Sequence, residues 1–197
     1  PSVQSMLTRG TEHKVVSYIR RMGAEGVWRY LEEKDFLSEA AKPLVNVNGS
    51  FLSCNPSAEC AKYCYATKGH YTYAGSSVKS ELIYWAVTTD PNRVADRIYR
   101  EYQALRESHQ SKALRLFDKG DLDEAWLPMI EELNRRGIVT QIFSKRSEVL
   151  QRVDDTQNVV MLSIDHSNTD MLDQYPTMPI AFVYRGKQDM SSLEPCK

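Results

Sequence analysis

Three of the four cysteines, Cys54, Cys60 and Cys64, fall within one stretch of eleven residues. Thiolates at this spacing on one loop can converge on a common centre. In a reducing compartment, such a group indicates metal or iron–sulfur ligation before disulfide formation. We therefore predict that this loop holds an inorganic centre, with unrelated buried cysteines as the alternative.

The spacing also bears on which centre is bound. Three sulfurs fit three irons of a [4Fe–4S] cluster and leave the fourth iron open for a small ligand. Adding Cys196 or His70 would instead close a four-coordinate site, for zinc or for the cluster. The pattern Cys-x5-Cys-x3-Cys is wider than the usual pairing of zinc ligands, so it favours iron–sulfur over zinc.

Further polar residues follow predicted strands. They are candidate ligand-binding residues because the carboxyl ends of parallel strands meet at one edge of a sheet. The alternative for Asp121 or Asp123 is capping of the next helix, and for the others a satisfied turn. The set consists of Gly120, Asp121, Ser144, Lys145, Ser163 and Asp165.

The elements that position these residues alternate along the chain. Apolar patterning predicts helices at 13–23, 25–35, about 78–86, 91–107, 123–136 and 146–153, and a loop over 50–75. It predicts strands at 44–47, 113–117, 138–143, 159–164 and 180–184. Strands separated by helices of ten to fifteen residues are typical of βαβ units. We expect an α/β fold: a partial (βα) barrel or an open parallel sheet of about five strands, since the chain is too short for eight units.

Length and composition place limits on the protein. The 197 residues suit a βα domain over 43–197 with an N-terminal helical extension over 1–42. The formal net charge of −1 gives no general attraction to nucleic acid or to an anionic membrane. The sequence contains no apolar run long enough to span a bilayer, and its start lacks the apolar core of a signal peptide. A cytoplasmic protein is expected.

The order of these pieces resembles the gene product 88 domain family of phages and mobile elements. The resemblance covers about residues 45–197 and implies fold and ligand expectations more than an activity. Members tend to carry more cysteines near the C-terminus, so the identity of the fourth ligand is not decided here. The residues that carry the resemblance are Cys54, Cys60, Cys64, Tyr65, Ala66, Gly69, Gly120, Asp121, Trp126 and Ser144.

More distantly, the layout is similar to that of radical S-adenosylmethionine enzymes. Those enzymes place a cysteine triplet after the first strand and a glycine-rich turn, which binds the methionine amine, after the second. The Gly120-Asp121 turn would stand in the second place. The cysteine spacing here is wider than the usual Cys-x3-Cys-x2-Cys, so binding of S-adenosylmethionine is an analogy.

Two functions follow from these patterns. The first is a radical S-adenosylmethionine-like enzyme that uses a [4Fe–4S] cluster, with Asp121 at the amine of S-adenosylmethionine. The second is a non-enzymatic accessory module with a structural zinc or iron–sulfur site. Such a module would contact nucleic acid through Arg93, Arg97 and Arg100, which share a helical spacing. The patterns do not identify a substrate.

Overall fold

A single six-stranded sheet forms the centre of the protein, here described from a computed structural model that covers residues 12–39, 45–67, 69–105, 107 and 113–183. The strands are β1 (Leu37–Glu39), β2 (Val45–Val47), β3 (Leu114–Leu116), β4 (Thr140–Ser144), β5 (Val159–Ile164) and β6 (Ile180–Phe182), and they lie in chain order. The pairs from β2 to β6 are parallel, while β1 is antiparallel to β2. The predicted α/β class is confirmed, in its open-sheet form.

The helices and strands follow the predicted pattern, with three elements that were not predicted. The structure contains α2 (Glu12–Glu32), α3 (Ala58–Tyr63), α4 (Ala74–Thr89), α5 (Pro91–Gln103), α7 (Leu127–Arg135), α8 (Ser147–Leu150) and α9 (Met171–Gln174), with 3-10 turns η2 (Tyr65–Thr67), η3 (Gly69–Thr72) and η4 (Glu124–Trp126). The strand β1, the helix α9 and the helical turns within 50–75 were not predicted. The two helices predicted at 13–23 and 25–35 are confirmed as the two segments of α2, which meet at a kink at Gly23, where the backbone is not helical.

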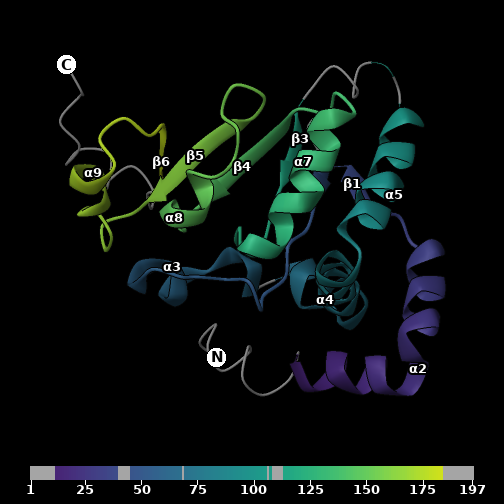
Figure 1. Cartoon of the computed structure of the whole chain (residues 1–197). Helices are drawn as coiled ribbons and strands as arrows, with labels where there is room; N and C mark the ends of the chain where they lie inside the picture. Colours follow the sequence, from purple (N-terminus) through teal and green to yellow (C-terminus); the bar gives the residue numbers. More distant parts are fainter. Residues whose placement is uncertain (1–11, 40–44, 68, 106, 108–112, 184–197) are drawn as a thin grey trace.

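Capping residues explain where the long helix α5 begins. The Asp90 side chain accepts a hydrogen bond from the Arg93 backbone N–H at 3.0 Å, and Pro91 occupies the first turn. Its buried side, which includes Val94 and Ile98, faces the core. Figure 1 shows α5 and α7 side by side over one face of the sheet. These two helices therefore cover the apolar face of the central strands.

The alternation of side chains along the strands separates two faces of the sheet. Leu114, Leu116 and Ile142 are fully buried within the hydrophobic core. The residues between them point to the other face, where the Arg115 guanidinium lies 5.4 Å from the centre of the Phe143 ring. That second face, half-buried and partly polar, is the one from which a site can be built.

The N-terminal helix contributes to the same core. Val27 and Leu31 of α2 are almost fully buried, and the Trp28 ring lies 6.0 Å from that of Trp85 in α4. The helix therefore packs against α4 (Figure 1). The division at residue 42 stays a prediction.

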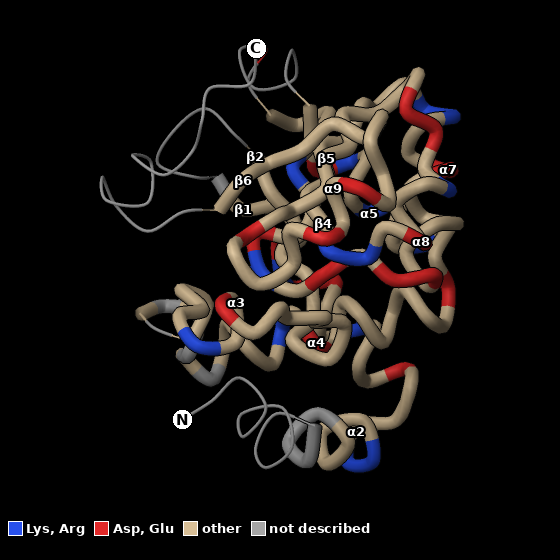
Figure 2. The backbone as a smooth tube through the Cα atoms, turned by 90° about the vertical axis from the view of Figure 1, so that its left-hand side faces the viewer, with Lys and Arg blue, Asp and Glu red and all other residues tan. Residues whose placement is uncertain are grey.

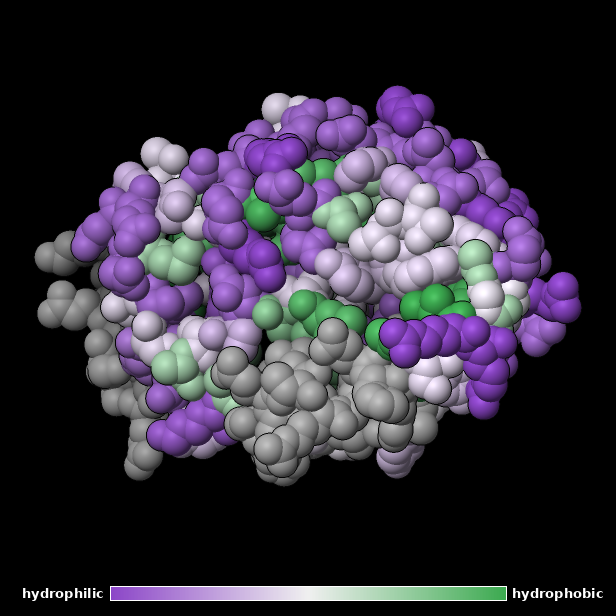
Figure 3. Space-filling view, turned by 60° about the horizontal axis from the view of Figure 1, so that its bottom comes forward, coloured by the Kyte–Doolittle hydropathy of each residue, from purple (hydrophilic) through white to green (hydrophobic). Residues whose placement is uncertain are grey.

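The surface carries both signs of charge. Lys and Arg positions are interspersed with Asp and Glu along the backbone (Figure 2), and hydrophilic residues cover most of the face seen in Figure 3. Within the described residues, every helix is too short or too polar to span a bilayer. The expectation that the membrane is not a partner and the expectation of a cytoplasmic location both stay predictions.

Truncation of a core leucine tests this packing. Leu133 of α7 is completely buried, whereas Leu172 of α9 is 36% exposed. We expect Leu133→Ala to lower the free energy of unfolding by about 2–5 kcal/mol, because it leaves a cavity in the core. The same substitution at Leu172 should change it by about 0.5 kcal/mol or less. Chemical denaturation followed by circular dichroism measures both, and equal losses would contradict the assigned core.

Candidate functional site

A cavity of about 980 Å³ opens between the cysteine loop and the carboxyl ends of the parallel strands. It brings together residues that are more than a hundred positions apart in the sequence. Its lining includes every site residue predicted from the sequence within the described part of the chain: Cys54, Cys60, Cys64, Gly120, Asp121, Ser144, Lys145, Ser163 and Asp165. Their binding roles stay predictions, but their convergence on one space is observed.

The start of the cysteine loop is held by a buried carboxylate. Glu81 of α4 accepts hydrogen bonds from the Ser50 hydroxyl and, at 2.8 Å, from the Phe51 backbone N–H. The Ser50 oxygen accepts from the Leu52 N–H at 2.7 Å, and the Ser53 hydroxyl donates to the Ser50 carbonyl at 2.9 Å. These bonds fix the backbone that leads into Cys54.

The middle of the loop is a short helix that is anchored to the end of β5. The Ser57 oxygen accepts from the Cys60 N–H at 3.2 Å and so caps α3. The Ser57 hydroxyl donates to the Asp165 carboxylate, which also accepts from the Ser167 N–H and hydroxyl at 2.9 and 2.7 Å. Burial opposes ionisation, yet the hydrogen bonds from Ser57 and Ser167 lower the pKa of Asp165. An ionised Asp165 therefore ties α3 to the sheet (Figure 1).

Asp121 connects the turns after β3 and β4. Its Oδ1 accepts from the Ser144 hydroxyl, from the Leu122 N–H at 3.0 Å and from the Lys145 N–H at 3.2 Å. Its own N–H donates to the Ser53 hydroxyl at 3.2 Å, which reaches back to the cysteine loop. Burial raises the pKa of Asp121, although these hydrogen bonds work in the other direction. Asp121 thus positions the site, whatever else it binds.

Of the two aspartates considered for capping the next helix, Asp123 is the one that does so. Asp123 accepts a hydrogen bond from the Ala125 N–H at 3.0 Å and caps η4. Its Oδ2 also accepts from the hydroxyl of Tyr84. The sequence pattern left capping open between the two aspartates, and the structure assigns it to Asp123.

The three thiols differ in their surroundings. Burial raises the pKa of Cys54 to about 12, and the nearby Asp121 carboxylate adds to the effect. The Cys60 thiol donates a hydrogen bond to the Cys64 sulfur, which lowers the pKa of Cys64 and raises that of Cys60. Cys60 and Cys64 are therefore in direct contact, and Cys54 is close enough to interact with both electrostatically.

The fit of a metal centre depends on these donors. Among the residues that the structure describes, no three His, Cys, Asp or Glu side chains form an arrangement that would hold one metal ion. A [4Fe–4S] cluster makes a different demand, because each cysteine binds a separate iron. Cys196 lies outside the described residues, as does the side chain of His70, so the fourth ligand stays a prediction.

Sequence reasoning missed the cations of this site. Arg115, Lys119 and Lys145 line the same cavity, and only Lys145 was singled out. Lys119 is 2% exposed, and burial lowers its pKa to about 8. Arg115 could have been identified from the sequence, because a charged residue within an otherwise apolar strand indicates a side chain on the face of the sheet opposite the core. No sequence signal distinguished Lys119 from an exposed turn lysine.

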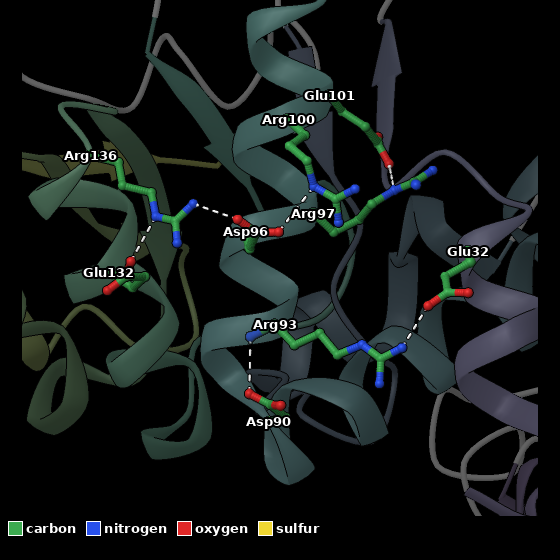
Figure 4. A network of polar contacts seen from close by, with 9 residues as sticks. All are labelled: Glu32, Asp90, Arg93, Asp96, Arg97, Arg100, Glu101, Glu132 and Arg136. Atoms are coloured by element: carbon green, nitrogen blue, oxygen red, sulfur yellow. Dashed lines mark hydrogen bonds and ion pairs between the residues drawn. The ribbon is translucent and has the colours of Figure 1, made fainter. Parts of the chain in front are cut away.

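The arginines of α5 have intramolecular partners (Figure 4). Arg93 forms an ion pair with Glu32 at 2.6 Å, and Arg97 forms one with Glu101 at 2.6 Å. Arg100 pairs with Asp96 at 3.0 Å, and Asp96 also pairs with Arg136 of α7. Each guanidinium of the predicted nucleic-acid strip is already paired with a carboxylate. The strip therefore joins α5 to α2 and α7, and it is a weak candidate for binding phosphate.

The fold and the site define a class of protein: an α/β protein whose open sheet carries a cysteine loop and a polar cavity at the carboxyl ends of its strands. The model of the family described as gene product 88 matches residues 30–194, and the chain belongs to this family. No curated protein and no solved structure matches the chain. The more distant resemblance to radical S-adenosylmethionine enzymes has no support from these comparisons.

The close approach of the Gly120 turn to the cysteine loop is testable. Gly120 has a φ of 84°, and a Cβ there would lie 2.8 Å from the Ser50 backbone nitrogen. Gly137 has a similar φ of 80° but open space around it. We expect Gly137→Ala to cost about 1–2 kcal/mol, the price of a left-handed backbone alone. Gly120→Ala should lower the free energy of unfolding further, as measured by chemical denaturation. Equal costs would contradict the close approach.

Proposed function

We propose that this protein binds a [4Fe–4S] cluster through Cys54, Cys60 and Cys64. The observation that carries the proposal is the gathering of three thiols at a cavity whose lining also includes the buried cation Lys119. Thiolates are the ligands that iron–sulfur clusters prefer. Ligation would replace the hydrogen bond between Cys60 and Cys64, because each sulfur would then bind its own iron.

Charge balance supports the same assignment. Three thiolates together with a cluster carry net negative charge, which is costly in a partly buried cavity without compensation. The hydrogen bond to Cys64 and burial raise the pKa of Cys60, and the positive charge of Lys145 opposes this rise. Lys119 lies close enough to Cys54 to interact with it. Asp121 and Asp165 are already engaged by hydroxyl and backbone N–H donors. The uncommitted charge around the thiols is therefore positive.

A zinc site is less well supported. One zinc ion needs its ligands to meet around a single atom, and the described residues contain no such group of three. Zinc would depend on further ligands outside the described residues, with Cys196 as the candidate. The cluster needs only the three loop cysteines, which leaves one iron open.

Cysteine substitutions test the cluster. Anaerobic purification should give brown protein with about four iron and four sulfide per chain, whose visible absorption dithionite bleaches. Cys54→Ser, Cys60→Ser and Cys64→Ser should each lose most of the iron, as measured by elemental and sulfide analysis. Stoichiometric zinc without iron in the unmodified protein would refute the proposal.

The matched control for these substitutions is Cys196→Ser. Retention of the cluster in this variant would agree with an open iron. Loss of the cluster would assign Cys196 as the fourth ligand, and the site would then be closed and structural.

The cavity beside the cysteines supports a bound small molecule rather than a purely structural centre. Its volume of about 980 Å³ lies at the upper end of the usual range for ligand pockets. We propose a ligand with an amine and a carboxylate, of which S-adenosylmethionine is the form that gives an enzyme. Lys145 would pair with the carboxylate, and Asp121 would accept from the amine through Oδ2. Phe117, Phe143 and Val183 offer apolar surface to the rest of the molecule.

A reduced cluster held by Cys54, Cys60 and Cys64 would supply the electron for cleavage of the sulfonium carbon–sulfur bond of S-adenosylmethionine. The residues of the chain bind and orient the ligand: the Ser144 and Ser163 hydroxyls lie on the lining, and the strand ends that carry them are held together by hydrogen bonds.

Addition of S-adenosylmethionine to the loaded, reduced protein tests the ligand. We expect a change in the electron paramagnetic resonance signal of the cluster, because the ligand binds at the open iron, followed by formation of 5′-deoxyadenosine. Lys145→Met should weaken the spectral response at a given concentration, whereas Lys34→Met, at an exposed position, should not. A loaded protein that gives neither response would leave an accessory module with an iron–sulfur site.

A further inference from the structure

Lys119 is an unusual residue in this site because its ammonium group is buried without a hydrogen bond. The residue is 2% exposed, and its Nζ has no hydrogen-bond partner. Burial of a charge is costly unless the charge is paired and hydrogen-bonded. A buried, unpartnered ammonium therefore indicates that a partner belongs beside it.

The surroundings of Nζ restrict what that partner is. The group lies 4.4 Å from the centre of the Phe51 ring, and the charged groups that influence it are Glu81, Cys54 and Lys79. Glu81 uses its Oε2 for the Ser50 hydroxyl and its Oε1 for the Phe51 N–H. Glu81 therefore attracts the Lys119 ammonium without forming a hydrogen bond to it. Lys79 is itself positively charged, and its Nζ donates to the Asp35 carbonyl at 2.9 Å, so it cannot be the partner. The remaining group is the Cys54 sulfur.

The backbone around Lys119 cannot easily carry the side chain elsewhere. Phe117 has a φ of 64° and Gly120 has a φ of 84°, so the turn is built from two left-handed residues. The Lys119 carbonyl oxygen lies 2.6 Å from where a Cβ of Gly49 would be, which shows how closely the two turns pack. The turn that carries Lys119 and the turn that leads to Cys54 are thus one rigid unit.

We propose that Lys119 is a positioning residue that sets the reduction potential of the cluster bound at Cys54. Its ammonium places a fixed positive charge, and an N–H donor, in the protein interior near the Cys54 sulfur. This inference rests on the proposed iron–sulfur function. One-electron reduction adds negative charge to the cluster, so a nearby positive charge stabilises the reduced form and raises the potential.

The role of Lys119 differs from that of the other cations. Lys119 borders the cavity as well, but its Nζ is buried and has no hydrogen-bond partner. Lys145 lies on the cavity wall beside Cys60 and fits the carboxylate of a ligand. Lys119 instead acts on the cluster through the protein interior, where screening by salt is weak.

The test is a redox titration of the loaded protein with dithionite, followed by visible absorption and electron paramagnetic resonance. Lys119→Met keeps the length of the side chain and removes the charge, while Lys119→Arg keeps the charge. We expect Lys119→Met to load iron and sulfide as the unmodified protein does and to show a lower midpoint potential. Lys119→Arg should stay close to the unmodified protein, and the exposed Lys34→Met serves as the matched control with no shift.

Each outcome separates this inference from the function on which it rests. An unmodified protein that binds no iron or sulfide overturns the proposed function and this inference with it. A Lys119→Met protein that loads normally but keeps its midpoint potential overturns only the role of Lys119. Lys119→Gln is the second neutral variant. If both neutral variants fold, as judged by circular dichroism, but lose the cluster, Lys119 acts on assembly and the inference is equally overturned.

Discussion

The buried carboxylate of Glu81 is the interaction on which the rest of the site depends. Glu81 comes from the helix α4, yet both of its oxygens are spent on the backbone and hydroxyl of the loop that precedes Cys54. Burial raises the pKa of this carboxyl, and the donors from the loop and the positive charge of Lys119 oppose the effect. Burial of a carboxylate costs free energy unless its hydrogen bonds are all formed. The position of Glu81 therefore determines the conformation of the loop that supplies the donors.

From this point the site is assembled by polar contacts between strand ends. The Ser53 hydroxyl accepts a hydrogen bond from the Asp121 N–H, and the Asp121 carboxylate accepts one from the Ser144 hydroxyl. The Ser57 hydroxyl donates to Asp165 at the end of β5. The first two contacts join turns that follow neighbouring parallel strands, and the third joins the cysteine loop after β2 to the end of β5. The same side chains that line the cavity are therefore the ones that hold it in shape, which is why the aspartates cannot be counted simply as ligands for a substrate.

The electrostatic character of the site follows from this use of the carboxylates. Once Asp121 and Asp165 are satisfied internally, Lys119 and Lys145 remain to interact electrostatically with the thiols, while Arg115 on the same lining forms an ion pair with Asp118 at 3.5 Å. Such surroundings suit an anionic centre and the anionic end of a small molecule. The arginines of α5 are paired within the protein, in the network that joins α5 to α2 and α7. The ammonium of Lys119, by contrast, is buried near Cys54 without a hydrogen-bond partner.

Much of this protein was determined by its sequence alone. The alternation of apolar strands with amphipathic helices is a local signal, so the α/β class and the five parallel strands were predictable. The three cysteines and the polar residues after each strand were also predictable as neighbours, since the carboxyl ends of parallel strands meet at one edge. The short strand β1 and the helix α3 were not, because they are stabilised by pairing with β2 and by capping from Ser57.

Only the tertiary structure decided which polar groups of the site are hydrogen-bonded within the protein and which lack such a partner. Asp121 and Lys119 are two charged residues of one turn, and the sequence pattern singled out only the aspartate. Folding commits Asp121 to Ser144 and Lys145, and it buries the Lys119 ammonium near Cys54 without a hydrogen bond. Burial and partnership depend on contacts between residues far apart in the chain, and these exist only once the sheet, the loop and α4 have come together.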